Sequence, residues 1–136
     1  MLTADDKWAI AETLALHGHL FDEGELERLD ELFTDDVVYD VSALGSDVLV
    51  GIDAVRDAAL QLGAGNPVAH LVTNVVITEV DDDTATVRSK GTAVLADRGS
   101  VTATYVDTVR RGPNGWRLAH REIIPRRIPL GGRTAG

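Results

Sequence analysis

A histidine and an aspartate that lie far apart in the chain have side chains suited to proton transfer. His70 is near the start of "PVAHLVTNVVITEV", a run typical of a buried strand, and Asp22 ends a helical pattern in "LFDEG". An imidazole acts as a general base near neutral pH when a carboxylate fixes its tautomer. Proton abstraction beside a carbonyl, with loss of water or a double-bond shift, needs little more than that base and an oxyanion donor. Considered alone, two such residues more often serve as a helix cap and a hydrogen-bonded core histidine.

Alternation places Tyr105 and Asp107 on one face of a predicted strand at 100–111. Inside an apolar cavity Asp107 would have to be hydrogen-bonded or neutral, and a neutral acid could donate a proton, as in ketosteroid isomerase. An equally good alternative is that this face points to solvent or to a dimer partner. On the last predicted strand His120 and Arg121 alternate, and we expect Arg121 to point inward.

The remaining histidines and aromatic residues give no metal or nucleotide site. His17 and His19 are two residues apart on a predicted helix, so they point to different faces. No histidines have the i, i+4 spacing of a metal-binding helix and there are no cysteines, so we expect neither a metal nor another cofactor. Four aromatic residues are assigned to the core or the cavity wall: Trp8, Trp116, Phe21 and Phe33.

Helical periodicity comes first in the chain and strand-like runs follow. Thr3 is the predicted N-cap of a helix over 4–23, and further helices are predicted at 25–33 and in "DAVRDAALQLG", with the strand "VVYDVS" between them. Four more strands are predicted at 68–80, 84–96, 100–111 and 115–125. This order predicts an α+β fold in which a long curved sheet, mostly antiparallel, wraps the helices as a cone with an apolar interior for a small molecule. We expect one domain over residues 1–128 and a flexible tail over 129–136.

The composition excludes some classes of partner. The 136 residues carry a net charge of −9, which disfavours nucleic-acid binding, although seven arginines in the last 27 residues could form a local wall for an anionic group. No segment resembles a signal peptide or a membrane span, so we expect a cytoplasmic protein that binds no membrane.

Several motifs, taken in order, resemble a known family. "LFDEGELERLDELFTDDVVYDVS", "GIDAV", "AHLVTNVVI", "DDDTATVRS", "TYVDTVRR" and "NGWRLAHREI" resemble the SnoaL-like branch of the nuclear transport factor 2-like (NTF2-like) superfamily, over roughly residues 8 to 125. Within it, the chain looks most like the group of scytalone dehydratase, bile-acid dehydratase and lindane dehydrochlorinase.

The resemblance assigns roles to individual residues. It implies a catalytic dyad of Asp22 and His70, with Tyr39 of "VVYDVS" as the aromatic hydroxyl that members of the group often carry. Some members place a tyrosine or lysine five residues before the aspartate, where this chain has His17, so His17 is the expected pocket residue and His19 the surface one. The second histidine of scytalone dehydratase has no counterpart near residues 98–104, which puts that particular substrate in doubt.

The function expected from these observations is that of a cofactor-independent lyase or isomerase of the dehydratase type. His70, Asp22 and Tyr39 would be catalytic, and an apolar, polycyclic or aromatic substrate would contact His17, Tyr105, Asp107, Arg121 and Trp8. The alternatives are a polyketide cyclase, an epoxide hydrolase that uses Asp107 and Arg121, or a non-catalytic binding or dimerisation module. We also expect a homodimer or higher homo-oligomer, because the outer face of such a sheet is commonly buried against a second copy.

Overall fold

The structure, a computed structural model, describes residues 1–135. Its α-helices and strands are α1 (Ala4–Asp22), β1 (Phe33–Asp40), β2 (Val48–Val50), α2 (Ile52–Leu62), β3 (Ala69–Asp81), β4 (Thr84–Val94), β5 (Ser100–Gly112) and β6 (Gly115–Pro125). The short 3-10 segments are η1 (Leu26–Glu31), η2 (Ser42–Leu44), η3 (Gly63–Gly65) and η4 (Pro129–Gly132).

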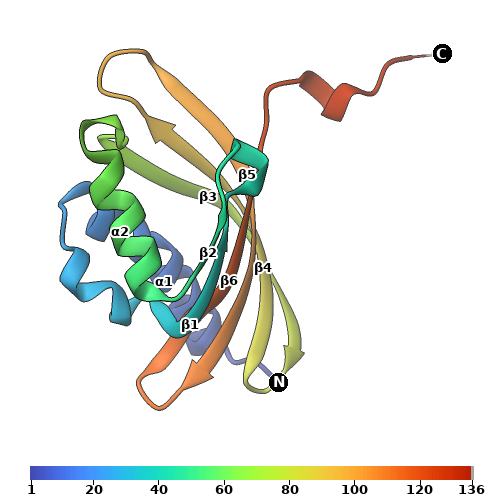
Figure 1. Ribbon diagram of the computed structural model, residues 1–136. Coiled ribbons are helices and arrows are strands. Elements are labelled where there is room, and N and C mark those ends of the chain that lie inside the picture. Colours follow the sequence, from blue (N-terminus) through green and yellow to red (C-terminus); the bar gives the residue numbers. More distant parts are fainter. Residues whose placement is uncertain (136) are drawn as a thin grey trace.

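One six-stranded sheet with the order β2-β1-β6-β5-β4-β3 forms the body of the protein. β1 runs parallel to β6, and every other neighbouring pair is antiparallel. The sheet curves around α1 and α2, which lie on its concave side (Figure 1). The predicted α+β cone is therefore confirmed, and its sheet is mixed and mostly antiparallel.

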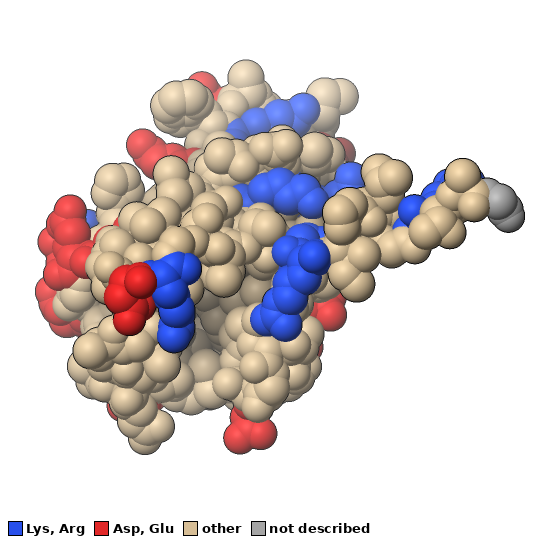
Figure 2. All heavy atoms as spheres, turned by 90° about the horizontal axis from the view of Figure 1, so that it is seen from above, with Lys and Arg blue, Asp and Glu red and all other residues tan. Residues whose placement is uncertain are grey.

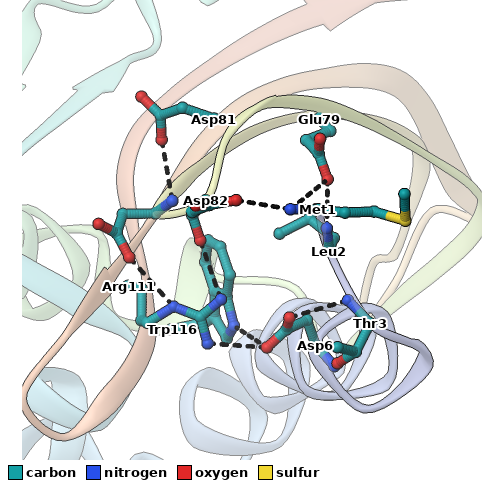
Figure 3. A network of polar contacts seen from close by, with 10 residues as sticks. Met1, Leu2, Thr3, Asp6, Glu79, Asp81, Asp82, Arg111 and Trp116 are labelled. Carbon is teal, nitrogen blue, oxygen red and sulfur yellow. Dashed lines mark hydrogen bonds and ion pairs between the residues drawn. The ribbon is translucent and has the colours of Figure 1, made fainter.

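The first turn of α1 is fixed at both the local and the tertiary level. Thr3 Oγ1 accepts a hydrogen bond from the Asp6 amide at 3.1 Å, and the Asp6 carboxylate accepts one from the Thr3 amide at 2.9 Å, which completes a capping box. The Asp6 carboxylate also accepts a hydrogen bond from Arg111 Nη1 at 2.8 Å. Arg111 Nε donates another hydrogen bond to Asp83 in the β3–β4 turn (Figure 3). The helix that ends at Asp22 is thus anchored to the sheet at its other end.

A bulge in β3 determines which of its side chains face the helices. Asn74 has φ 57°, a left-handed conformation that asparagine tolerates, and the register with β4 shifts between Thr73 and Val76. Val72 and Val75 therefore both pack against the core although they are three residues apart, while Val76 is exposed. Thr73 and Asn74, which follow His70 in the sequence, therefore belong to this bulge.

Three sequence-based expectations need correction or completion. The segment predicted as a helix over 25–33 is the 3-10 segment η1, and the short edge strand β2 was not predicted. The C-terminal tail contains η4 and extends away from the body in Figure 1, and residue 136 lies outside the described part of the chain. None of the helices within residues 1–135 is long and apolar enough to cross a membrane.

Candidate active site

The last residue of α1 and the second residue of β3 form the pair predicted from the sequence. Asp22 Oδ1 lies 2.6 Å from His70 Nδ1, and Asp22 Oδ2 accepts a hydrogen bond from the His70 backbone amide at 3.0 Å. Because a carboxylate only accepts, Nδ1 carries the hydrogen, and in a neutral imidazole the free lone pair is then on Nε2. The two side chains are 17% and 22% exposed, so the pair is shielded but accessible.

A glycine permits the close approach that this pair requires. Gly18 lies one helical turn before Asp22, and a Cβ at position 18 would lie 2.5 Å from the His70 carbonyl oxygen. Because the nearest atom belongs to the backbone of β3 and not to a flexible side chain, the strand itself would have to move to relieve the contact. Gly18 therefore sets the distance between α1 and the start of β3 at which Asp22 contacts both the ring Nδ1 and the backbone amide of His70.

His17 and Tyr39 make a second polar contact beside the dyad. His17 Nε2 is 3.1 Å from the Tyr39 hydroxyl, and the His17 ring lies edge-on to His70 with ring centroids 5.4 Å apart. Burial, followed by the charges of Arg121 and His70, holds the pKa of His17 well below its ordinary value. Burial also raises the pKa of Tyr39 to about 12. At neutral pH the contact therefore joins a neutral imidazole and a protonated phenol.

A buried ion pair lies deeper in the cone. Arg121 is 1% exposed, and its Nε and Nη2 donate to Asp107 Oδ1 and Oδ2 at 2.8 and 3.0 Å. Burial acts to lower the pKa of Arg121, but the charge and hydrogen bonds of Asp107 outweigh it, so that pKa is raised. The guanidinium carbon lies 4.0 Å from the centroid of the Tyr105 ring, which covers it. Tyr105 in turn occupies space that any side chain at Gly91 would fill.

The main cavity of the cone consists of two adjoining lobes of about 590 and 600 Å³, and Tyr39, His70 and Ile123 are among the six residues that line both. Its other walls are largely aliphatic, from residues such as Leu49, Val55, Ala93 and Leu95. Figure 2 shows the hollow at this end of the molecule with basic side chains around it, and Arg126 and Arg127 line one lobe. A small, mostly apolar molecule fits this space, with His70 of the dyad at one wall.

Seven of the eight site residues predicted from the sequence are brought together here: Asp22, His70, Tyr39, His17, Tyr105, Asp107 and Arg121. Arg121 points inward as expected. Trp8 does not belong to the group, because its side chain is 72% exposed on the outer side of α1, and its assignment to substrate binding and the cavity wall was wrong. The hypothesis that Asp107 is a neutral proton donor also fails, because both of its oxygens accept from a guanidinium.

Comparison with protein families gives a match to the SnoaL-like domain over residues 3–122. The chain belongs to the SnoaL-like family. No functionally curated protein matches it in sequence.

Solved structures of relatives share the whole fold. An NTF2-like protein with a cystatin-like fold from Novosphingobium aromaticivorans is 30% identical, with a TM-score of 0.74, 95% of this chain covered and 84% of the other. A second protein of that organism, provisionally named an aromatic ring hydroxylase, is 28% identical, with a TM-score of 0.75 and 92% of both chains covered. A third, provisionally named a scytalone dehydratase, is 22% identical, with a TM-score of 0.74, 90% of this chain and 85% of the other covered, and shows the fold alone.

Proposed function

We propose that this SnoaL-like protein is a cofactor-independent lyase or isomerase of the dehydratase type that acts on a small apolar substrate. The observation that carries the proposal is the double contact of Asp22 with the ring Nδ1 and the backbone amide of His70. It leaves the basic nitrogen of His70 free, and His70 lines the cavity. A carboxylate behind a histidine fixes the tautomer of the imidazole and so favours its action as a general base.

In the proposed reaction His70 Nε2 removes a proton from a carbon next to a carbonyl group. The electron pair of the C–H bond forms a double bond, and the negative charge that develops on the carbonyl oxygen needs a hydrogen-bond donor. Tyr39 supplies this donor, because its phenol stays protonated at neutral pH. If His17 Nε2 donates its hydrogen to the Tyr39 oxygen, the hydroxyl hydrogen of Tyr39 remains available to the substrate.

The test is turnover of a panel of apolar cyclic β-hydroxy carbonyl compounds by the wild type and by variants of the dyad. We expect His70→Ala to abolish turnover, and His70→Gln and Asp22→Asn to lower it by roughly 10²–10⁴-fold while the fold and the cavity persist. His19→Gln is the matched control, because His19 is exposed on the same helix and should leave turnover unchanged. A loss of less than tenfold in His70→Gln would count against the role of general base.

Two other functions are less well supported by the geometry. An epoxide hydrolase of the superfamily would use Asp107 to activate water, but Asp107 is paired with Arg121 through both of its oxygens and does not line either lobe of the main cavity. A binding module needs the cavity but not the dyad. A compound that binds equally well to wild type and His70→Gln, with no turnover by either, would favour the binding module.

A further inference from the structure

The two lobes of the main cavity differ in charge. In the lobe of about 590 Å³, here named the arginine lobe, the charged residues of the wall are Arg126 and Arg127, and no carboxylate of the described chain lines it. In the lobe of about 600 Å³ the charged residue is Asp47, and no lysine or arginine of residues 1–135 lines it. The whole chain has 22 acidic and 13 basic residues, so the arginine lobe has the opposite charge to the protein as a whole.

The guanidinium of Arg127 is available to a ligand. Five other arginines form ion pairs with carboxylates: Arg28, Arg56, Arg110, Arg111 and Arg121. Arg127 is exposed, lines the arginine lobe, and makes no side-chain hydrogen bond or ion pair within residues 1–135. Basic side chains surround the hollow at this end of the molecule in Figure 2. An anion that entered the arginine lobe would therefore not have to displace a carboxylate of the protein.

Arg126 differs from Arg127 in the direction of its side chain. Its Nε donates a hydrogen bond to Thr104 Oγ1 at 3.0 Å. Thr104 directly precedes Tyr105, which lines the arginine lobe, so alternation along β5 places the Thr104 side chain on the convex face. The Arg126 side chain is therefore held toward the convex face, and Arg127 is the residue whose charge can serve the cavity.

The separation between Arg127 and the dyad sets the length of a ligand that contacts both. Ile123 of β6 lines both lobes, as His70 does, and Arg127 follows Ile123 by four residues. An extended chain rises about 3.3 Å per residue, so this separation is up to about 13 Å. Other wall residues of the arginine lobe are aliphatic: Ala93, Leu95, Val101 and Ala103. A ligand that contacts both His70 and Arg127 therefore has an apolar body between a reacting carbon and an acceptor group.

We propose that the arginine lobe binds an anionic group of the substrate, such as a carboxylate, on the guanidinium of Arg127. This rests on the proposed lyase function and narrows it, because the substrate would then be an apolar acid whose reacting end lies at His70. The planar donors of a guanidinium match the geometry of a carboxylate.

The charges of the two lobes also fix the direction in which such a substrate lies. Asp47 in the other lobe repels an anionic group, whereas Arg127 attracts it. At about 0.15 M salt, charges more than roughly 8 Å away are largely screened. Arg127 can therefore attract an anion locally although the net charge of the protein is −9.

Binding of two naphthalenes that share a shape and differ in charge tests this subsite without turnover. Naphthalene-2-carboxylate and naphthalene-2-carboxamide are titrated into the full chain, and their own fluorescence gives the dissociation constants. We expect the wild type to bind the carboxylate about fivefold more tightly than the amide at low salt, as for a partly exposed charge-assisted hydrogen bond. This preference should decrease as sodium chloride is raised, because salt screens an exposed ion pair. Equal affinity for the two compounds at low salt would overturn the subsite.

Variants show whether the preference comes from Arg127. Arg127→Gln should remove the preference, Arg127→Lys should keep part of it, and the affinity for the amide should be the same in both variants as in the wild type. Arg133→Gln is the matched control, because it removes the same charge from an exposed C-terminal residue that lines neither lobe, and it should keep the wild-type preference. A preference that survives in Arg127→Gln, or that is lost equally in Arg133→Gln, would overturn the assignment. His70→Gln should also keep the preference, so an active His70→Gln would refute the proposed reaction without affecting this result.

Discussion

At the scale of single residues, burial sets the protonation state of His17. Its ring stacks on Phe21 with centroids 4.4 Å apart, and burial lowers its pKa well below the ordinary value of 6.5. The unfolded chain therefore binds a proton at His17 at pH values where the folded protein does not. The contribution of His17 to stability is present above about pH 6.5 and is lost as the pH falls below it.

We expect wild-type stability, measured by urea unfolding between pH 7 and pH 5, to fall more steeply than that of His17→Gln. The difference in slope should approach about 1.4 kcal/mol per pH unit, the limit for one proton. Most carboxyl groups titrate below this range, so the comparison isolates the histidine. His19→Gln, at an exposed position, should keep the wild-type slope. Parallel slopes for wild type and His17→Gln would contradict the buried neutral state.

At the scale of elements, the contact between α1 and β3 positions the dyad. Alanine in place of glycine inside a helix normally stabilises it by roughly 0.5–1 kcal/mol. At Gly18 we expect the opposite, because the added Cβ would meet the His70 carbonyl oxygen at 2.5 Å and push the strand away from the helix. Gly18→Ala should lower the melting temperature and weaken the Asp22–His70 hydrogen bond.

The measurement for Gly18→Ala combines thermal unfolding with the ¹⁵N and ¹H shifts of His70 Nδ1 in NMR spectra. Gly112→Ala is a suitable control, because a Cβ there would be 3.8 Å from the nearest atom, an ordinary contact. A stabilised Gly18→Ala with an unchanged Nδ1 signal would mean that the helix–strand distance is not limited by this glycine.

The sequence predicted those elements and residues that have a strong local signal. The Thr3 cap, α1, α2 and the four long strands follow from periodicity and turn residues, and the dyad follows from motifs at the ends of two such elements. Gly18 was not predicted as important, because a glycine within a helical pattern carries no local indication of what approaches it. The same holds for the bulge at Asn74, which depends on the pairing of β3 with β4.

The ion pair of Asp107 and Arg121 could be predicted only in part. Alternation along each strand indicated inward side chains, but their pairing depends on the register of β5 with β6, where the two residues are direct partners. Trp8 was wrongly assigned because apolar residues occur on several sides of the helical pattern, and the outer side of α1 accommodates a large aromatic residue in solvent.

At the scale of the whole molecule, the convex face of the sheet has a regular arrangement of charge. Val76, Arg88, Val106 and Glu122 are neighbours in register across β3, β4, β5 and β6. They point outward, because an adjacent residue on three of these strands (Val87, Asp107 and Arg121) is buried on the concave side. The row thus has a valine of β5 between a basic and an acidic residue.

We propose that this face associates with a second copy of the chain about a twofold axis along β5, at Val106. Such an axis places Arg88 of one copy opposite Glu122 of the other, and the reverse, so the row is complementary to itself. We expect light scattering to show a mass of about twice 14.6 kDa at micromolar concentration.

Arg88→Glu and Glu122→Arg should each weaken association by placing like charges opposite each other, and the double variant should restore it because the pairs are reformed with their signs exchanged. The control, Arg98→Glu, changes the charge by the same amount outside the row, in the segment between β4 and β5. A monomer at all concentrations would refute the association, and a dimer that neither single variant weakens would place the interface on another surface.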